Sequence, residues 1–174
     1  MDALRLVIPK KILDGIQEKR PDHWAPYAYE PSSLLSRAPM TDDGIKVPHN
    51  VGDDPGGVWD IVLDQYIGHH RYEHYDSYRA SLRSPNGDLT PGLVVKLLDI
   101  PMIGRINDGK AWLDCDVTLY ESAPEMQGKS LPRFAGLFGR GTLFCLVFDD
   151  AGRELTTEEG ITESVWQVTT PSLR

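Results

Sequence analysis

The sequence predicts an α+β protein built mainly on an antiparallel β-sheet, with one or two short helices. Apolar and polar residues alternate through residues 110–121, and residues 143–148 are apolar without interruption. Residues 84–88 read SPNGD, a turn of the kind that joins two antiparallel strands. A meander, a half-open barrel and a sandwich all fit these signals. A chain of 174 residues can bury the core of one domain, so we expect residues 1–174 to form a single domain.

The first twenty residues predict an extended segment followed by a short helix. Residues 3–8, ALRLVI, suit a strand, and Pro9 suits the first turn of a helix, where its missing N–H costs nothing. Ile12 and Ile16 then fall on one helical face, and Pro21 ends the segment. We therefore expect an amphipathic helix between the two prolines.

Residues 21–57 are expected to form an irregular, proline-rich segment that wraps around the domain or docks on a partner. Its prolines interrupt every possible element: Pro21, Pro26, Pro31, Pro39, Pro48 and Pro55. An irregular stretch of this length is uncommon inside a compact domain. The rings of Trp24, Tyr27 and Tyr29 favour docking over a solvated linker. Only residues 32–37 have a composition that suits a helical turn.

Residues 58–67, VWDIVLDQYI, fit either a helix or a strand. A helix would align Val58, Ile61, Val62 and Tyr66. A strand would align Trp59, Ile61, Leu63 and Ile67. Gly68 is expected to mark a change of direction in both cases, and residues 75–83 then continue as a strand into the SPNGD turn.

The alternation in residues 110–121 predicts a strand that is buried on one face only. Its apolar face would carry Ala111, Leu113, Cys115, Val117 and Leu119. Asp114 and Asp116 would share the wet face, where two carboxylates could act as a pair. Asn107–Gly109 would form the turn that precedes this strand.

Two further strands follow in the C-terminal part. Residues 143–148 predict a central strand covered on both faces, because every position in the run is apolar. Residues 149–152 carry a turn signal, and residues 164–169 suit a last strand.

The net charge and the cysteine content indicate which partners the protein could bind and which cellular compartment it occupies. The formal net charge of −8, without a basic patch, argues against a nucleic-acid or anionic-membrane partner. Cys115 and Cys145 lie in apolar runs, so we expect two buried, reduced thiols, although the sequence does not exclude a disulfide. Neither a signal peptide nor an apolar run long enough to span a bilayer is visible, and we expect a cytoplasmic protein.

The segment YIGHHRYEHYDSY, residues 66–78, holds three of the five histidines of the chain. On a helix, His70 and His74 would stand about 5–6 Å apart and could share one metal ion. On a strand they would stand roughly 13 Å apart, too far for one ion. We favour the strand, because the chain leads directly into the SPNGD turn, and we predict no metal site and no cofactor.

An extended chain after Gly68 would place several titratable side chains on one face: His70, Tyr72, His74, Asp76 and Tyr78. An imidazole titrates near neutral pH, and an adjacent tyrosine or aspartate can orient it. His70 and His74 are therefore the candidate acid–base residues. Tyr72, Asp76, Tyr78, Asp114 and Asp116 are the candidate ligand-binding residues.

Two functional hypotheses follow. The first is a protein that binds a ligand or partner and self-associates or joins a larger assembly, such as a virion, through residues 21–57. The second is a small cofactorless enzyme, such as a lyase, isomerase or hydrolase, with a histidine–tyrosine pocket in a curved sheet. No P-loop, G-x-S-x-G, C-x-x-C or H-E-x-x-H motif assigns a reaction.

Overall fold

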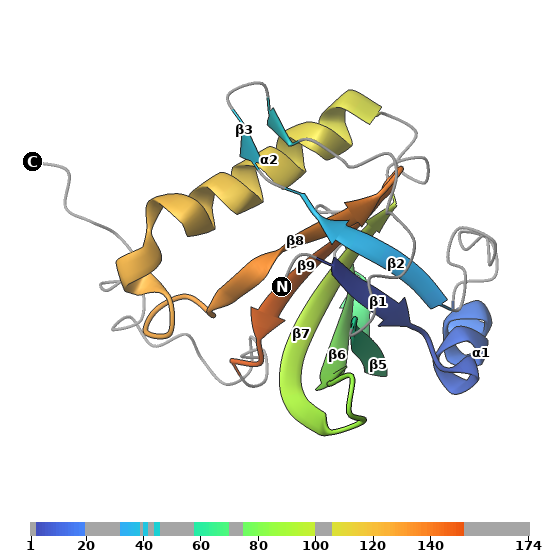
Figure 1. Ribbon diagram of the computed structural model, residues 1–174. Helices are drawn as coiled ribbons and strands as arrows, with labels where there is room; N and C mark the ends of the chain where they lie inside the picture. Colours follow the sequence, from blue (N-terminus) through green and yellow to red (C-terminus); the bar gives the residue numbers. More distant parts are fainter. Residues whose placement is uncertain are drawn as a thin grey trace, which may run out of the picture.

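The computed structural model describes residues 3–19, 32–38, 40–41, 44–45, 58–69, 75–99 and 106–151. Within these ranges, seven strands close into a barrel in the order β1-β2-β8-β9-β7-β6-β5 (Figure 1). The barrel strands are β1 (Ala3–Val7), β2 (Ser32–Arg37), β5 (Trp59–His69), β6 (Asp76–Arg83), β7 (Leu89–Asp99), β8 (Phe134–Arg140) and β9 (Leu143–Asp149). The remaining elements are α1 (Lys10–Lys19), β3 (Met40–Thr41), β4 (Gly44–Ile45), α2 (Ile106–Ser122) and the 3-10 helix η2 (Pro124–Met126).

The predicted predominance of antiparallel β-structure is confirmed, and the sheet is a closed barrel. Neighbouring strands are antiparallel except β1 and β5, which run parallel and close the ring. The meander is present only in part, because β5, β6 and β7 are neighbours in both sequence and space, whereas β9 separates β7 from β8. Closure satisfies the backbone groups that an open sheet would leave unpaired at its edges.

Several predicted elements are confirmed. The first strand and the helix after Pro9 form β1 and α1, and α1 places Ile12 against the barrel interior. The strand predicted at residues 75–83 is β6, and its turn forms as expected: the Gly87 N–H donates to the Ser84 carbonyl, and Gly87 has a φ of 91°. Residues 143–148 lie in β9, between β8 and β7, and all six are buried.

The prediction of a strand at residues 110–121 is wrong, because this segment belongs to the helix α2. The turn expected at Asn107–Gly109 is also wrong, since these residues form the first turns of α2. Leu113 and Val117 are buried, whereas Cys115 and Leu119 are exposed, which is the burial pattern of a helix. The same apolar residues fit both the alternation of a strand and the stripe of a helix. The helix forms because its stripe packs on the sheet beneath it.

Two predictions in the N-terminal half also need correction. Residues 32–37 form the strand β2 rather than a helical turn, since β1 and β8 supply hydrogen-bonding partners on either side. Gly68 does not reverse the chain: β5 continues to His69 with a register shift between Tyr66 and Gly68. The ambiguous residues 58–67 are extended, and all but Val58 belong to β5.

The residues described within the segment 21–57 include a barrel strand, β2, and the two-stranded ribbon of β3 and β4. The other residues of this segment, with Trp24, Tyr27 and Tyr29, lie outside the described residues. The strand predicted at residues 164–169 and the end of the turn signal at residues 149–152 also lie outside them.

The two cysteines have different environments. Cys145 is fully buried in β9, as predicted, whereas Cys115 is exposed on α2, so the prediction that it is buried is wrong. Both thiols are free. The exposure of Cys115 follows from the helical geometry, which turns it away from the face that carries Leu113.

Apolar side chains form two layers, one inside the barrel and one beneath α2. The interior receives residues from all seven strands: Leu4, Leu6, Leu35, Ile61, Leu63, Tyr78, Ala80, Val95, Leu97, Phe138, Leu143, Cys145 and Val147. The second layer lies between α2 and the outer face of β8 and β9, beside which α2 lies in Figure 1. It contains Leu98, Leu113, Val117, Leu137, Phe144, Leu146 and Phe148. Strand alternation in β9 supplies both layers.

Candidate functional site

The barrel interior is filled by side chains. Leu4, Leu63, Val95, Phe138 and Cys145 are each fully buried there. A seven-stranded barrel is near the size at which side chains alone fill the lumen. A site for a ligand is therefore expected where interior strands end, rather than along the barrel axis.

Polar groups enter the interior where β5 ends and β6 begins. Asp76 is only 7% exposed, and it is the only carboxylate in the buried class among the described side chains. The Tyr66 hydroxyl donates a hydrogen bond to Asp76 Oδ1 at 3.4 Å. The rings of Tyr66 and Tyr78 pack with their centroids 5.4 Å apart and their planes tilted by 60°. We refer to Tyr66, Asp76 and Tyr78 as the inner cluster.

The hydrogen-bonded pairing of β5 with β6 sets the position of the inner cluster. Asp76 and Tyr78 are two residues apart on β6 and both point inward, as the period of a strand requires. Tyr78 stands opposite Tyr66 on β5, and Asp76 pairs with the backbone of His69. The sequence prediction thus selected two residues that the fold brings together, Asp76 and Tyr78.

The other predicted residues of this segment, His70, Tyr72 and His74, lie outside the described residues. They belong to the chain that joins His69 to Tyr75, the residue before β6.

The sequence analysis missed Tyr66 as a site residue. Strict alternation in β5 places Leu63 and Ile67 on one face and Tyr66 on the other. The register instead shifts between Leu63 and Gln65, so Asp64 is an extra residue and Tyr66 turns inward, while Ile67 is 48% exposed. The tyrosine-rich composition of residues 66–78 is the sequence signal that could have identified this residue.

Asp114 and Asp116 lie on α2, in a different layer from the inner cluster. On a helix, residues two apart point about 200° away from one another, so the two carboxylates do not share a face. Both flank the buried stripe of Leu113 and Val117. Asp114 Oδ1 is shielded from solvent and accepts no hydrogen bond from any described residue.

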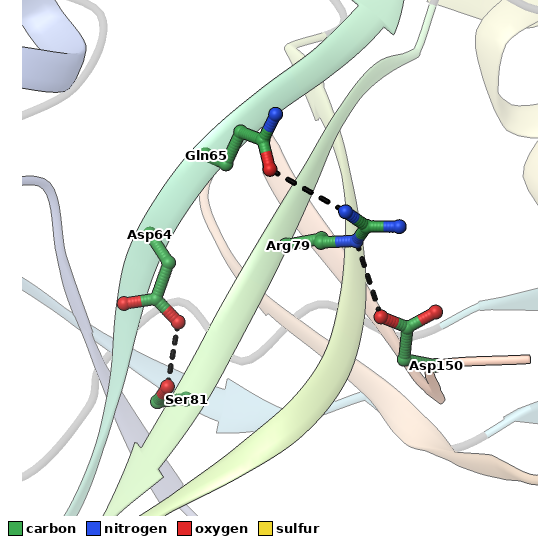
Figure 2. A network of polar contacts seen from close by, with 5 residues as sticks. All are labelled: Asp64, Gln65, Arg79, Ser81 and Asp150. Carbon is green, nitrogen blue, oxygen red and sulfur yellow. Dashed lines mark hydrogen bonds and ion pairs between the residues drawn. The ribbon is translucent and has the colours of Figure 1, made fainter. Parts of the chain in front are cut away.

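A polar network covers the outer face of β5 and β6 (Figure 2). Ser81 Oγ donates a hydrogen bond to Asp64 Oδ2 at 2.5 Å. Arg79 donates through an Nη atom to Gln65 Oε1 at 3.4 Å, and Arg79 Nε forms an ion pair with Asp150 Oδ2 at 3.2 Å. We call these five residues the outer network. It lies on the side of the sheet opposite the inner cluster.

Cys145 lies in the interior but is chemically inert. Complete burial raises its pKa from 9.0 to about 12, because the low-dielectric interior disfavours the thiolate. The thiol therefore stays protonated at neutral pH and is not a nucleophile.

No group of three or more histidine, cysteine, aspartate or glutamate side chains with the geometry of a metal site occurs within the described ranges. In the same part of the chain, no helix combines the length and the apolar character that crossing a membrane requires.

Comparisons with protein-family models, with curated proteins and with solved structures each found no match to this chain.

Proposed function

We propose that this barrel binds a small polar ligand at the end where β5 passes into β6, through Asp76 and Tyr66. The burial of the Asp76 carboxylate inside a barrel lined mainly by apolar side chains carries the proposal. Removing a carboxylate from water costs free energy, so a buried carboxylate needs hydrogen bonds, from the protein or from a ligand, that replace its hydration.

The chemistry of the inner cluster limits the kind of ligand. Carboxylate oxygens accept hydrogen bonds, a phenol both donates and accepts, and tyrosine rings offer a flat apolar surface. A ligand with hydrogen-bond donors attached to a planar or apolar group fits these partners. The filled lumen disfavours a long lipid chain. His70, Tyr72 and His74 are further candidate residues of this site on the basis of the sequence alone.

Ligand-observed NMR with three simple probes tests the proposal. Benzylamine, benzamide and benzyl alcohol share a flat apolar ring and differ in the donor that they present. We expect at least one to bind the wild-type chain and to lose affinity in Asp76→Asn and Tyr66→Phe. Asp60→Asn is the matched control, because it makes the same substitution on the outer face of β5, where Asp60 is paired with Arg5 and Arg83. Equal binding by Asp76→Asn and wild type would refute the proposal.

A cofactorless enzyme is the second candidate, favoured by the hydrogen bond between Tyr66 and Asp76. This pair sets a proton donor beside a carboxylate, and His70 or His74 would supply a group that titrates near neutral pH. Hydrolysis of 4-nitrophenyl acetate offers a direct probe. The expected result is a rate above that of free imidazole that falls in His70→Ala or His74→Ala. A rate unchanged in both variants and in Asp76→Asn would remove this candidate.

A further inference from the structure

The inward position of Tyr66 depends on one extra residue in β5. Leu63 pairs with Ala80 and Gln65 pairs with Arg79, so Asp64 has no counterpart in β6. Leu63 points into the barrel, and Asp64 and Gln65 then both lie on the outer face, where each binds a side chain of β6. Two consecutive residues on one face are typical of a β-bulge.

Without the bulge, the alternation of β5 would be reversed beyond Leu63. A shift of one residue moves every later side chain to the other face of a strand. Gln65 would then point into the apolar interior, and Tyr66 would point to solvent, away from Asp76. The contact between the Tyr66 and Tyr78 rings therefore exists because β5 carries the extra residue Asp64.

The outer network holds this bulge in place. Ser81 binds Asp64, the extra residue itself, and Arg79 binds the next residue, Gln65. Arg79 is in turn paired with Asp150 (Figure 2). Each contact of the outer network therefore involves either a residue of the bulge or the guanidinium of Arg79, which binds the bulge.

A second bulge lies on the other side of β6, at the same level. Ala80 pairs with Leu93 of β7, but Ser81 pairs with Pro91, which leaves Gly92 as the extra residue. The N–H of Asp150 donates to the Gly92 carbonyl at 2.8 Å. Asp150 therefore connects the two bulges, through its backbone to β7 and through its carboxylate to Arg79.

We propose that Asp64, Ser81 and Arg79 are positioning residues that hold the β5 bulge and thereby keep the Tyr66 hydroxyl on Asp76. The consequence for ligand affinity rests on the proposed function, whereas the effect on Tyr66 does not. The side chains of all three residues lie on the face of the sheet opposite the inner cluster.

NMR of the chain with labelled tyrosine measures the position of Tyr66 without a ligand. The Tyr66 signals are assigned by their loss in Tyr66→Phe. We expect the wild type to show a cross-peak between the rings of Tyr66 and Tyr78, and Asp64→Ala to lose at least about half of its intensity. Asp64→Asn keeps an oxygen acceptor for Ser81 and should retain the cross-peak. Asp60→Ala removes the same side chain four residues earlier, where the ladder is regular, and should also retain it.

Titration of the same variants with benzylamine then measures how the substitutions change ligand affinity. If benzamide or benzyl alcohol binds the wild type more tightly, that probe is used instead. The expected loss in Asp64→Ala is about tenfold, the effect of one charge-assisted hydrogen bond. A full cross-peak in Asp64→Ala overturns the positioning role, and so does its equal loss in Asp60→Ala. A lost cross-peak with unchanged affinity upholds positioning and refutes the proposed ligand site.

Ser81→Ala provides a second variant if Asp64→Ala does not fold. It removes the donor to Asp64 and leaves the bulge residue in the chain, so it tests the same hydrogen bond with a smaller change. A weakened Tyr66–Tyr78 cross-peak in this variant supports the positioning role, and a cross-peak of wild-type intensity contradicts it.

Discussion

Glycine has opposite effects on stability at Gly92 and Gly15: it is favourable at Gly92 and unfavourable at Gly15. Gly92 has a φ of 102° at the bulge of β7, a conformation that a residue with a Cβ adopts at a cost. Gly15 lies within α1, where glycine lacks the helix-forming tendency of alanine. A Cβ would meet no atom within 4 Å at either position, so backbone conformation alone separates them.

We predict that Gly92→Ala lowers the free energy of unfolding by about 1–2 kcal/mol, because the φ of the bulge disfavours alanine. Gly15→Ala is the matched control and should raise it by about 0.5–1 kcal/mol. Urea unfolding of both variants measures the difference. Equal and small effects would indicate that β7 does not carry this bulge in solution.

The two cysteines should differ in reactivity and in pH dependence. A water-soluble disulfide reagent should modify Cys115 rapidly in the native chain and Cys145 only after unfolding, because only Cys115 is exposed. The folded state raises the Cys145 pKa from 9.0 to about 12. The unfolded state therefore releases this proton first, and the contribution of Cys145 to stability should fall as the pH rises from about 9 to 12. Rapid labelling of Cys145 in Cys115→Ser would contradict its burial.

At the scale of elements, α2 illustrates why alternation can mislead. Residues 113, 115, 117 and 119 are apolar and satisfy a strand, yet Leu113, Val117 and Tyr120 also satisfy a helix. The helix forms because its stripe covers the outer face of β8 and β9. Both patterns coexist in one segment, and only the apolar surface available for packing distinguishes them.

Alanine substitutions separate the two interpretations of α2. We predict that Leu113→Ala lowers stability by about 2–5 kcal/mol, because the Leu113 side chain is fully buried between α2 and the sheet. Leu119→Ala should change it by no more than about 0.5 kcal/mol, since Leu119 is 51% exposed. Thermal or urea unfolding provides both values. Similar large losses in the two variants would favour the strand, in which both side chains share a face.

The strand β2 shows a different reason for a failed prediction. Residues 32–37, SSLLSR, carry little strand tendency of their own. They become extended because Leu35 enters the barrel interior and both edges find partners, in β1 and β8. The sequence around residues 32–37 contains neither of these partner strands, so it does not reveal that the segment is extended.

At the scale of the whole molecule, β2 changes how self-association through residues 21–57 can be tested. Deleting this segment removes β2, which joins β1 to β8 and so closes the barrel. We therefore expect the deleted chain to unfold whatever its oligomeric state. An unfolded product would carry no information about assembly.

Substitution of the aromatic residues is the sharper experiment. If residues 21–57 dock on a second copy, the wild type should sediment above its chain mass of 19.5 kDa. The combined variant Trp24→Ala, Tyr27→Ala and Tyr29→Ala should then sediment as a monomer with an intact barrel, because the docking rings are gone. A monomeric wild type would argue against assembly by this segment.

The local sequence was sufficient to predict β9, the β6–β7 turn and the placement of Asp76 and Tyr78 on one face of β6. Each depends on a short-range rule: a continuous apolar run, a glycine with positive φ, or the two-residue period of a strand. Barrel closure, the helix α2, the strand β2 and the inward turn of Tyr66 depend on contacts between segments far apart in the chain. Their physical cause is the burial and hydrogen bonding that distant strands supply, and for Tyr66 it is a single extra residue in β5 that no periodic pattern reveals.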